Sequence, residues 1–206
     1  MDGSTARSPS STGARMAEVL LFHHVQGLTP GLVDVAEALR SAGHTVHAPD
    51  LFDGRTFATI EEGLAHAQSV GFASLHERAS EVAAALPDAL VYVGFSIGVM
   101  DAQRLAQTRP GAAGAVLLDS CAPLGEFAPG WPAGVPVQIH GGEADSFFMD
   151  EGDVEAARQV VEAADDGELF TYAGCGHLFA DASSEAYDAD AAALVRQRVL
   201  DFLARV

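Results

Sequence analysis

The sequence LVYVGFSIG at residues 90–98 decides the fold of this 206-residue chain. An apolar, β-rich run ends there in Gly-x-Ser-x-Gly, and a helical pattern follows directly over Val99 to Thr108. The glycines on either side of the serine let the chain make a sharp strand-to-helix turn, which lifts the hydroxyl of Ser96 above the edge of a sheet. The following helix aims free backbone N–H groups at whatever the serine attacks. The stretch therefore predicts a nucleophile at the carboxyl end of a strand.

Six short β-rich runs alternate with helical patterns along the chain. We expect strands at Val19–His23, Thr45–Ala48, Leu90–Val93, Gly114–Leu118, Val135–His140 and Leu169–Tyr172. We expect helices near Pro30–Ala42, Ile60–Ala67, Ser74–Ala85, Val99–Thr108, Glu151–Ala164 and Asp188–Ala204. Strands separated by helices of this length form parallel βαβ units. The expected fold class is α/β, with one parallel sheet of about six strands, helices on both faces, and a ligand site beyond the carboxyl ends of the strands.

The composition limits the partners and the chemistry of the chain. There are 29 acidic and 11 basic residues and a net charge of −18, which disfavours nucleic acid and anionic membranes as partners. The chain contains no lysine, which excludes Schiff-base chemistry, lysine-bound pyridoxal phosphate and a Walker-A lysine. With only two cysteines and no apolar run of membrane-span length, we expect reduced thiols and a cytoplasmic location.

The chain divides into two parts. Residues 1–15 are rich in Ser, Gly and Thr and lack the apolar region of a secretory signal, so we expect a disordered leader. Residues 16–206 are expected to form a single domain, without internal repeats or a second core. The sequence leaves open whether this domain is a monomer or a homodimer.

Two further polar residues follow later strands in the order that a serine hydrolase of this architecture needs. Asp145 follows the fifth expected strand and His177 follows the sixth. A serine hydroxyl is a poor nucleophile until an imidazole removes its proton, and a carboxylate must hold that imidazole in one tautomer. We therefore expect Ser96 to attack, His177 to act as base and then as acid, and Asp145 to orient the ring. Asp119 and Glu143 are the rival acids.

The developing oxyanion needs N–H donors placed in advance, each worth roughly 3 kcal/mol in hydrolases of this kind. We assign one to the backbone of Ile97 and the second to Val25, in the turn after the first strand. No cofactor and no metal is required. His23, His24 and His140 also end strands, but the chain lacks the H-x-x-x-H and H-E-x-x-H spacings of zinc sites.

Four side chains are candidates for a substrate pocket. His24 lies beside Val25 in the turn after the first strand, which we call the oxyanion turn. Phe127 and Trp131 lie in the Pro- and Gly-rich loop before the fifth strand, and Phe147 follows the expected acid. The loops that carry them are expected to overhang Ser96. Packing in the core or in a lid is an equally good explanation for the aromatic residues.

From Glu18 to the C-terminus the chain resembles the dienelactone hydrolase family of α/β-hydrolases. The likeness rests on Gly27-Leu28, Ala48-Pro49-Asp50-Leu51-Phe52, the turn at Gly94–Gly98, Gly142-Glu143-Ala144-Asp145, and the stretch YAGCGHLF at residues 172–179. The resemblance implies Ser96, Asp145 and His177 as the triad, with Val25 and Ile97 as oxyanion donors. It also implies the strand order 2-1-3-4-5-6, in a sheet that lacks the superfamily's two leading strands.

Three departures from the family pattern bear on the substrate. The name-giving enzymes of the family use a cysteine nucleophile, where this chain has Ser96. They carry a glutamate beside the oxyanion turn, where this chain has His24. They bind a substrate carboxylate with arginines, one of them shortly after the catalytic histidine, where this chain reads LFAD at residues 178–181. We therefore expect a neutral ester rather than a dienelactone.

The expected function is that of a serine hydrolase that cleaves a small ester, lactone or thioester through an acyl-enzyme. Two alternatives stay open. An acyltransferase or thioesterase would use the same triad and, as a transferase, pass the acyl group to an acceptor other than water. A catalytically idle α/β-hydrolase would instead bind a small ligand or a protein partner.

Overall fold

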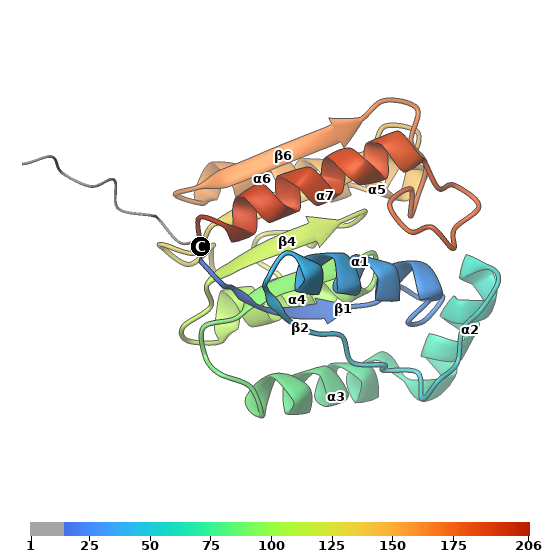
Figure 1. Cartoon of the computed structure of the whole chain (residues 1–206), viewed down its shortest axis with the longest axis horizontal. Helices are drawn as coiled ribbons and strands as arrows, with labels where there is room; N and C mark the ends of the chain where they lie inside the picture. The colour runs from blue at the N-terminus through green and yellow to red at the C-terminus, as the bar shows by residue number, and fades with distance from the viewer. Residues whose placement is uncertain (1–14) are drawn as a thin grey trace, which may run out of the picture.

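The computed structural model describes residues 15–206, so the expected leader lies, except for Arg15, outside the described residues. Within this range a parallel sheet of six strands forms the centre of the molecule, in the order β2-β1-β3-β4-β5-β6 (Figure 1). The strands are β1 (Glu18–Phe22), β2 (Thr45–His47), β3 (Val91–Phe95), β4 (Gly114–Leu118), β5 (Val137–Gly142) and β6 (Gly167–Tyr172). Both the α/β class and the strand order expected from the sequence are confirmed.

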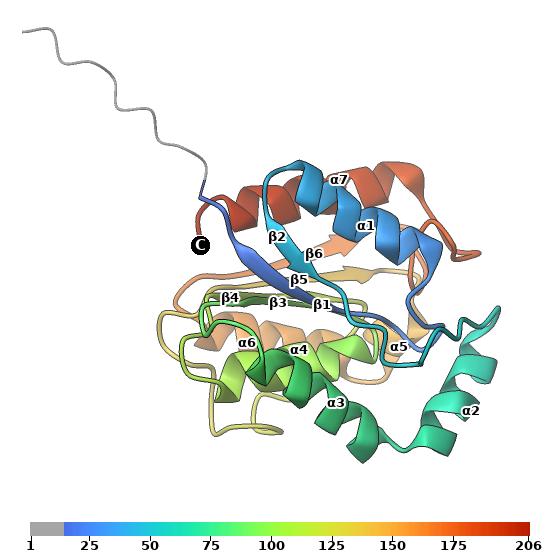
Figure 2. The same cartoon turned by 60° about the horizontal axis from the view of Figure 1, so that its bottom comes forward.

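Helices cover both faces of the sheet. They are α1 (Pro30–Ser41), α2 (Ile60–Val70), α3 (Phe72–Ala84), α4 (Gly98–Thr108), α5 (Ser146–Asp150), α6 (Asp153–Ala163) and α7 (Ala189–Leu203). Figure 2 shows α1 and α7 on one face and α3, α4 and α6 on the other. The sequence predicted all of these except α5, a helix of little more than one turn. No helix among residues 15–206 is long and apolar enough to cross a bilayer.

Two apolar layers hold the sheet between its helices. Side chains alternate along each strand, so that on β1 Leu20 and Phe22 pack toward α3, α4 and α6, whereas Val19 and Leu21 pack toward α1 and α7. Because both faces are covered, the central strands read as continuous apolar runs, which makes them visible in the sequence. The same alternation places Phe95, the last residue of β3, in the layer under α1 and α7.

The turn between β3 and α4 is held by close backbone approaches. Ser96 has a φ of 51°, in the left-handed region that side chains other than glycine rarely adopt. A Cβ on Gly94 would come within 2.5 Å of the carbonyl oxygen of Gly98, and a Cβ on Gly98 would come within 2.5 Å of that of Phe22. The N–H of Ser96 donates to the carbonyl of Leu118 on β4 (2.8 Å). There is therefore no room for a side chain at either glycine, and the neighbouring strands β1 and β4 both contact the turn.

We predict that Gly98→Ala lowers the free energy of unfolding by about 1–3 kcal/mol, because its methyl group would be pushed against the backbone of β1. Urea denaturation followed by circular dichroism measures the change. Gly125→Ala is the matched control, since a Cβ there meets nothing within 4 Å. Equal urea midpoints for the two variants would contradict the packing described for the turn.

Candidate active site

Three polar side chains meet beyond the carboxyl edge of the sheet. The Oγ of Ser96, which follows β3, lies 2.9 Å from Nε2 of His177, in the loop after β6. Nδ1 of the same ring lies 2.7 Å from Oδ2 of Asp145, which follows β5. The structure thus brings together the three residues that the sequence selected for this role. The arrangement allows a proton to pass from the serine hydroxyl to the imidazole while the carboxylate holds the ring in one tautomer.

The carboxylate of Asp145 is fixed from its other side. Asp145 is 1% exposed, and its Oδ1 accepts a hydrogen bond from the N–H of Phe147 (3.0 Å) as the N-cap of α5. Neither rival acid bonds to His177: Glu143 accepts a hydrogen bond from the hydroxyl of Thr171 (2.8 Å), and Asp119 makes no contact of hydrogen-bond geometry with the ring. The short helix α5, which the sequence did not predict, therefore helps to orient the acid.

The imidazole of His177 sits in a strongly acidic environment. Burial alone would lower its pKa, but the hydrogen bond to Asp145 and the charges of Asp119, Asp145 and Asp153 outweigh burial and raise the pKa above the ordinary value of 6.5. The carboxylates thus favour the protonated ring, which is the form that a general base reaches after it has taken a proton.

The backbone groups expected to bind an oxyanion lie beside Ser96. Val25 and Ile97 both line the hollow over the serine, and the N–H of neither is used in a hydrogen bond among residues 15–206. The turn that carries Val25 rests on α2, where Gly63 leaves room for the Val25 carbonyl. The side chain of Gln26 donates to two carbonyls in the loop before α2 (2.8 and 3.3 Å). Contacts with α2 and with the loop before it therefore hold this turn in place, and the N–H of Val25 is available to a ligand.

The expectation that His24 lines the substrate pocket is wrong. Its side chain is fully buried, and Nε2 lies 2.7 Å from the carboxylate of Asp181. Nδ1 accepts a hydrogen bond from the N–H of Gln26 (3.2 Å), so the proton is on Nε2 and is donated to Asp181. The hydroxyl of Thr29, which caps α1, donates to the same carboxylate oxygen (2.7 Å). His24 and Asp181 thus tie the oxyanion turn to the loop that carries His177, a role for Asp181 that its sequence neighbours did not signal.

Two of the three aromatic candidates also lie outside the hollow. The loop at residues 122–134 lies against α4 and not over Ser96. Gln103 and Gln107 on that helix hold it there by donating hydrogen bonds to its carbonyls. Trp131 is buried there, with its N–H donating to the carbonyl of Val135 (2.7 Å), and Phe127 is not among the residues that line the hollow. Phe147 does line the hollow, and its ring centroid lies 4.9 Å from that of His177.

The hollow over Ser96 has a volume of about 230 Å³ and is partly open to solvent. Its lining combines apolar side chains with carboxylates and includes no arginine. The residues are Val25, Ile60, Leu64, Ser96, Ile97, Asp119, Ser120, Phe147, Glu151, Asp153 and His177. The space suits a small substrate, and its polarity is opposite to that of a site that binds a carboxylate.

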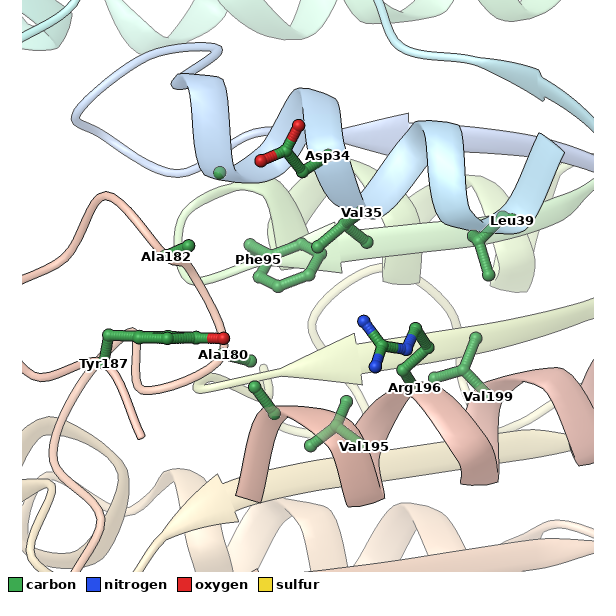
Figure 3. Close-up of a pocket in the computed structure, with 12 residues that line it drawn as sticks. Asp34, Val35, Leu39, Phe95, Ala180, Ala182, Tyr187, Val195, Arg196 and Val199 are labelled. Carbon is green, nitrogen blue, oxygen red and sulfur yellow. The ribbon is translucent and has the colours of Figure 1, made fainter. Parts of the chain in front are cut away.

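A second cavity lies between α1 and α7 (Figure 3). It has a volume of about 190 Å³ and apolar walls that include Val35, Phe95 and Val199, with the charged side chains of Asp34 and Arg196 also lining it. It holds no serine, cysteine or histidine. The chemistry that the sequence predicts therefore belongs to the hollow over Ser96. Among residues 15–206, no group of His, Cys, Asp and Glu side chains is arranged to hold a metal ion.

Comparison with known proteins gives a family for the chain and solved structures that share its fold. A sequence model of the dienelactone hydrolase family matches residues 1–206. Among solved structures, a dienelactone hydrolase-like promiscuous phosphotriesterase from metagenomic libraries is similar with a TM-score of 0.72 and 18% identity, over 95% of this chain and 89% of that chain. The dienelactone hydrolase of Anabaena variabilis gives a TM-score of 0.61 and 20% identity, over 92% and 86% of the two chains. A thioesterase domain from the curacin biosynthetic pathway gives a TM-score of 0.62 and 19% identity, over 91% of this chain and 92% of that chain. A search of curated proteins found no match.

We predict that Asp181→Asn lowers the free energy of unfolding at neutral pH by about 2 kcal/mol, because one buried donor around Asp181 loses its acceptor. Burial raises the pKa of Asp181, but hydrogen bonds from His24, Ser183 and Thr29 outweigh it and hold the pKa below the ordinary 3.8. The stabilisation is therefore present above pH 3.8 and disappears as the pH falls through the lower pKa of the folded protein.

Urea unfolding of the two proteins across this pH range measures the difference. Asp34→Asn, at an exposed position on α1, is the matched control. A stability difference that persists unchanged when the wild-type carboxyl is protonated would contradict the assignment.

Proposed function

This chain belongs to the dienelactone hydrolase family, and from that premise we propose that it is a serine hydrolase that cleaves a small ester-type substrate through an acyl-enzyme. The proposal depends above all on the continuous hydrogen bonds from Ser96 through His177 to Asp145. The free N–H groups of Val25 and Ile97 beside the serine support it, because acyl transfer needs donors where negative charge develops.

In the first half-reaction, Nε2 of His177 takes the proton of Ser96 as Oγ bonds to the substrate carbonyl carbon. The carbonyl π electrons move onto oxygen, and the N–H groups of Val25 and Ile97 donate to that oxyanion. When the tetrahedral intermediate collapses, the bond to the leaving oxygen breaks. His177 then donates its proton to the departing alcohol, while Asp145 stabilises the imidazolium.

In the second half-reaction, water takes the place of the alcohol. His177 removes a proton from water as its oxygen attacks the acyl carbon, and the same N–H groups bind the second oxyanion. Collapse breaks the bond to Oγ, and the proton returns to Ser96. The enzyme is regenerated, and one ester and one water have become one acid and one alcohol.

The strained backbone at Ser96 fits this role. A left-handed φ at a serine costs of the order of 1 kcal/mol and persists only where the surrounding structure imposes it. Here the strain points Oγ toward His177 and places the following N–H, that of Ile97, beside the same hollow. A serine in an ordinary connecting turn would not need this geometry.

We predict that Ser96→Ala abolishes turnover of p-nitrophenyl acetate, with a loss of about 10³-fold or more, because the covalent step is removed. The variant keeps the wild-type urea midpoint, since the side chain only loses its hydroxyl. A fluorophosphonate probe labels the wild-type protein at Ser96, and peptide mass spectrometry locates the adduct.

Ser69→Ala, at an exposed position on α2, serves as the control for both measurements. Activity retained by Ser96→Ala, or the absence of an adduct on Ser96 in the wild-type protein, would overturn the proposed function. The second result would favour a binding protein, because only an activated serine reacts rapidly with the probe.

We predict that kcat/KM falls about tenfold per pH unit on the acid side of the profile, because only the neutral ring of His177 accepts a proton. The carboxylates around the ring raise its pKa, so the midpoint of this fall lies above pH 6.5. Initial rates at constant ionic strength measure it, with circular dichroism at each pH to exclude unfolding. A flat profile from about pH 5 to about pH 8 would rule out His177 as the base.

A further inference from the structure

The surroundings of Ser96 are acidic without any compensating cation. Asp119, Glu151 and Asp153 line the hollow over the serine. A neighbouring hollow, which shares Ile60 and His177 with the first, adds Glu61 and Glu185. Neither lining includes an arginine, and the chain has no lysine. Apart from the ring of His177, the ionisable side chains that a substrate meets near Ser96 are therefore all carboxyl groups.

Asp119 is the most unusual of these carboxylates. It follows β4 with a φ of 60°, is 1% exposed, and lines the hollow. The N–H of Leu178 lies nearby, but neither carboxylate oxygen of Asp119 has a hydrogen-bond partner among residues 15–206. Burial raises the pKa of Asp119 to about 7, and the neighbouring His177 counteracts only part of this effect. Buried polar groups without partners are rare in proteins, and one that lines a hollow is open to a water, an ion or a ligand.

The other two carboxylates of the hollow differ in their hydrogen bonds. Asp153, in the first turn of α6, accepts hydrogen bonds from the hydroxyl of Ser120 (2.7 Å) and the N–H of Cys121 (3.0 Å). Glu151 is exposed, and its side chain makes no hydrogen bond or ion pair with residues 15–206. Asp119 and Glu151 can therefore both respond to a ligand, whereas Asp153 adds its charge from a fixed position.

The rest of the hollow is apolar and aromatic. Ile60 and Leu64 on α2 form one wall, and Phe147 lies 43% exposed against the ring of His177. An aromatic face attracts a cation that has lost part of its hydration, and most strongly one with methyl groups in contact with the ring. Carboxylates beside an aromatic and aliphatic surface suit an alkylated ammonium group better than a compact, strongly hydrated ion.

We propose that the substrate of this hydrolase is an ester that carries an ammonium group, placed by Asp119 and Glu151 beside the reacting carbonyl. The proposal rests on the serine hydrolase function proposed above and names its substrate class. A bound cation also supplies a counter-charge for Asp119, which favours the ionised form of this buried carboxyl group. The neutral ester expected from the sequence is then a poorer substrate than its cationic isostere.

The test compares esters that differ only in charge. Acetylthiocholine is paired with 3,3-dimethylbutyl thioacetate, which places the charge in the leaving group. The p-nitrophenyl ester of 4-(trimethylammonio)butanoate is paired with that of 5,5-dimethylhexanoate, which places it in the acyl group. In at least one pair we expect kcat/KM to be about tenfold higher for the cationic ester at low salt, and the preference to shrink at high salt.

Two variants connect the preference to the carboxylates. Glu151→Gln and Asp119→Asn should each reduce the cationic-to-neutral ratio by about threefold, and the double variant should bring it close to one. The ratio cancels any effect on His177 that is common to both esters. Glu162→Gln is the matched control, because it removes the same charge from the far end of α6. Should Asp119→Asn fold poorly, Glu151→Gln, at an exposed position, still tests the proposal.

The outcomes separate this proposal from the proposed function. Turnover of the neutral esters with no preference for the cation in either pair overturns the ammonium substrate and leaves the serine hydrolase intact. A cationic preference that Glu151→Gln and Asp119→Asn leave unchanged also overturns it. Absence of turnover for every ester, with no fluorophosphonate adduct on Ser96, overturns both.

Discussion

The close approach of three backbone segments around Ser96 is the constraint on which the rest of the site depends. Gly98 begins α4 against the carbonyl of Phe22 at the end of β1, and Gly94 packs against Gly98 itself. With no side chain at either position, β3 can turn directly into the helix and hold Ser96 in a left-handed conformation. The residues that complete the site arrive from the ends of β1, β5 and β6, so their positions follow from the order of the strands.

The sequence predicted the features that depend on local pattern and chain order. Strands buried on both faces leave apolar runs, and helices between them enforce a parallel sheet. All parallel strands then end at one edge, so polar residues just past β3, β5 and β6 had to lie near one another. For this reason Ser96, Asp145 and His177 could be selected without knowing a single distance.

The features that the sequence did not reveal depend on contacts between distant loops. Whether His24 faced the hollow or the protein interior was decided by Asp181, which lies 157 positions away. The course of the loop at residues 122–134 was decided by Gln103 and Gln107, polar residues whose partners are backbone carbonyls. Such contacts have no periodicity, and so no pattern in the sequence reports them. His24, which precedes the expected oxyanion donor Val25, is therefore buried against Asp181, although its sequence position suggested substrate contact.

The acidic cluster would connect His177, the proposed base, to the proposed cationic substrate. The charge of Asp119 raises the pKa of His177, which by itself reduces the fraction of neutral base at a given pH. A cation bound between Asp119 and Glu151 would offset part of that charge, and the pKa of His177 would fall. Coupling of this kind is reciprocal, so the neutral, reactive form of the ring would bind the cationic substrate more tightly than the protonated form does. The same carboxylates that favour the protonated ring of His177 in the empty site would thus hold a cationic substrate beside the neutral ring.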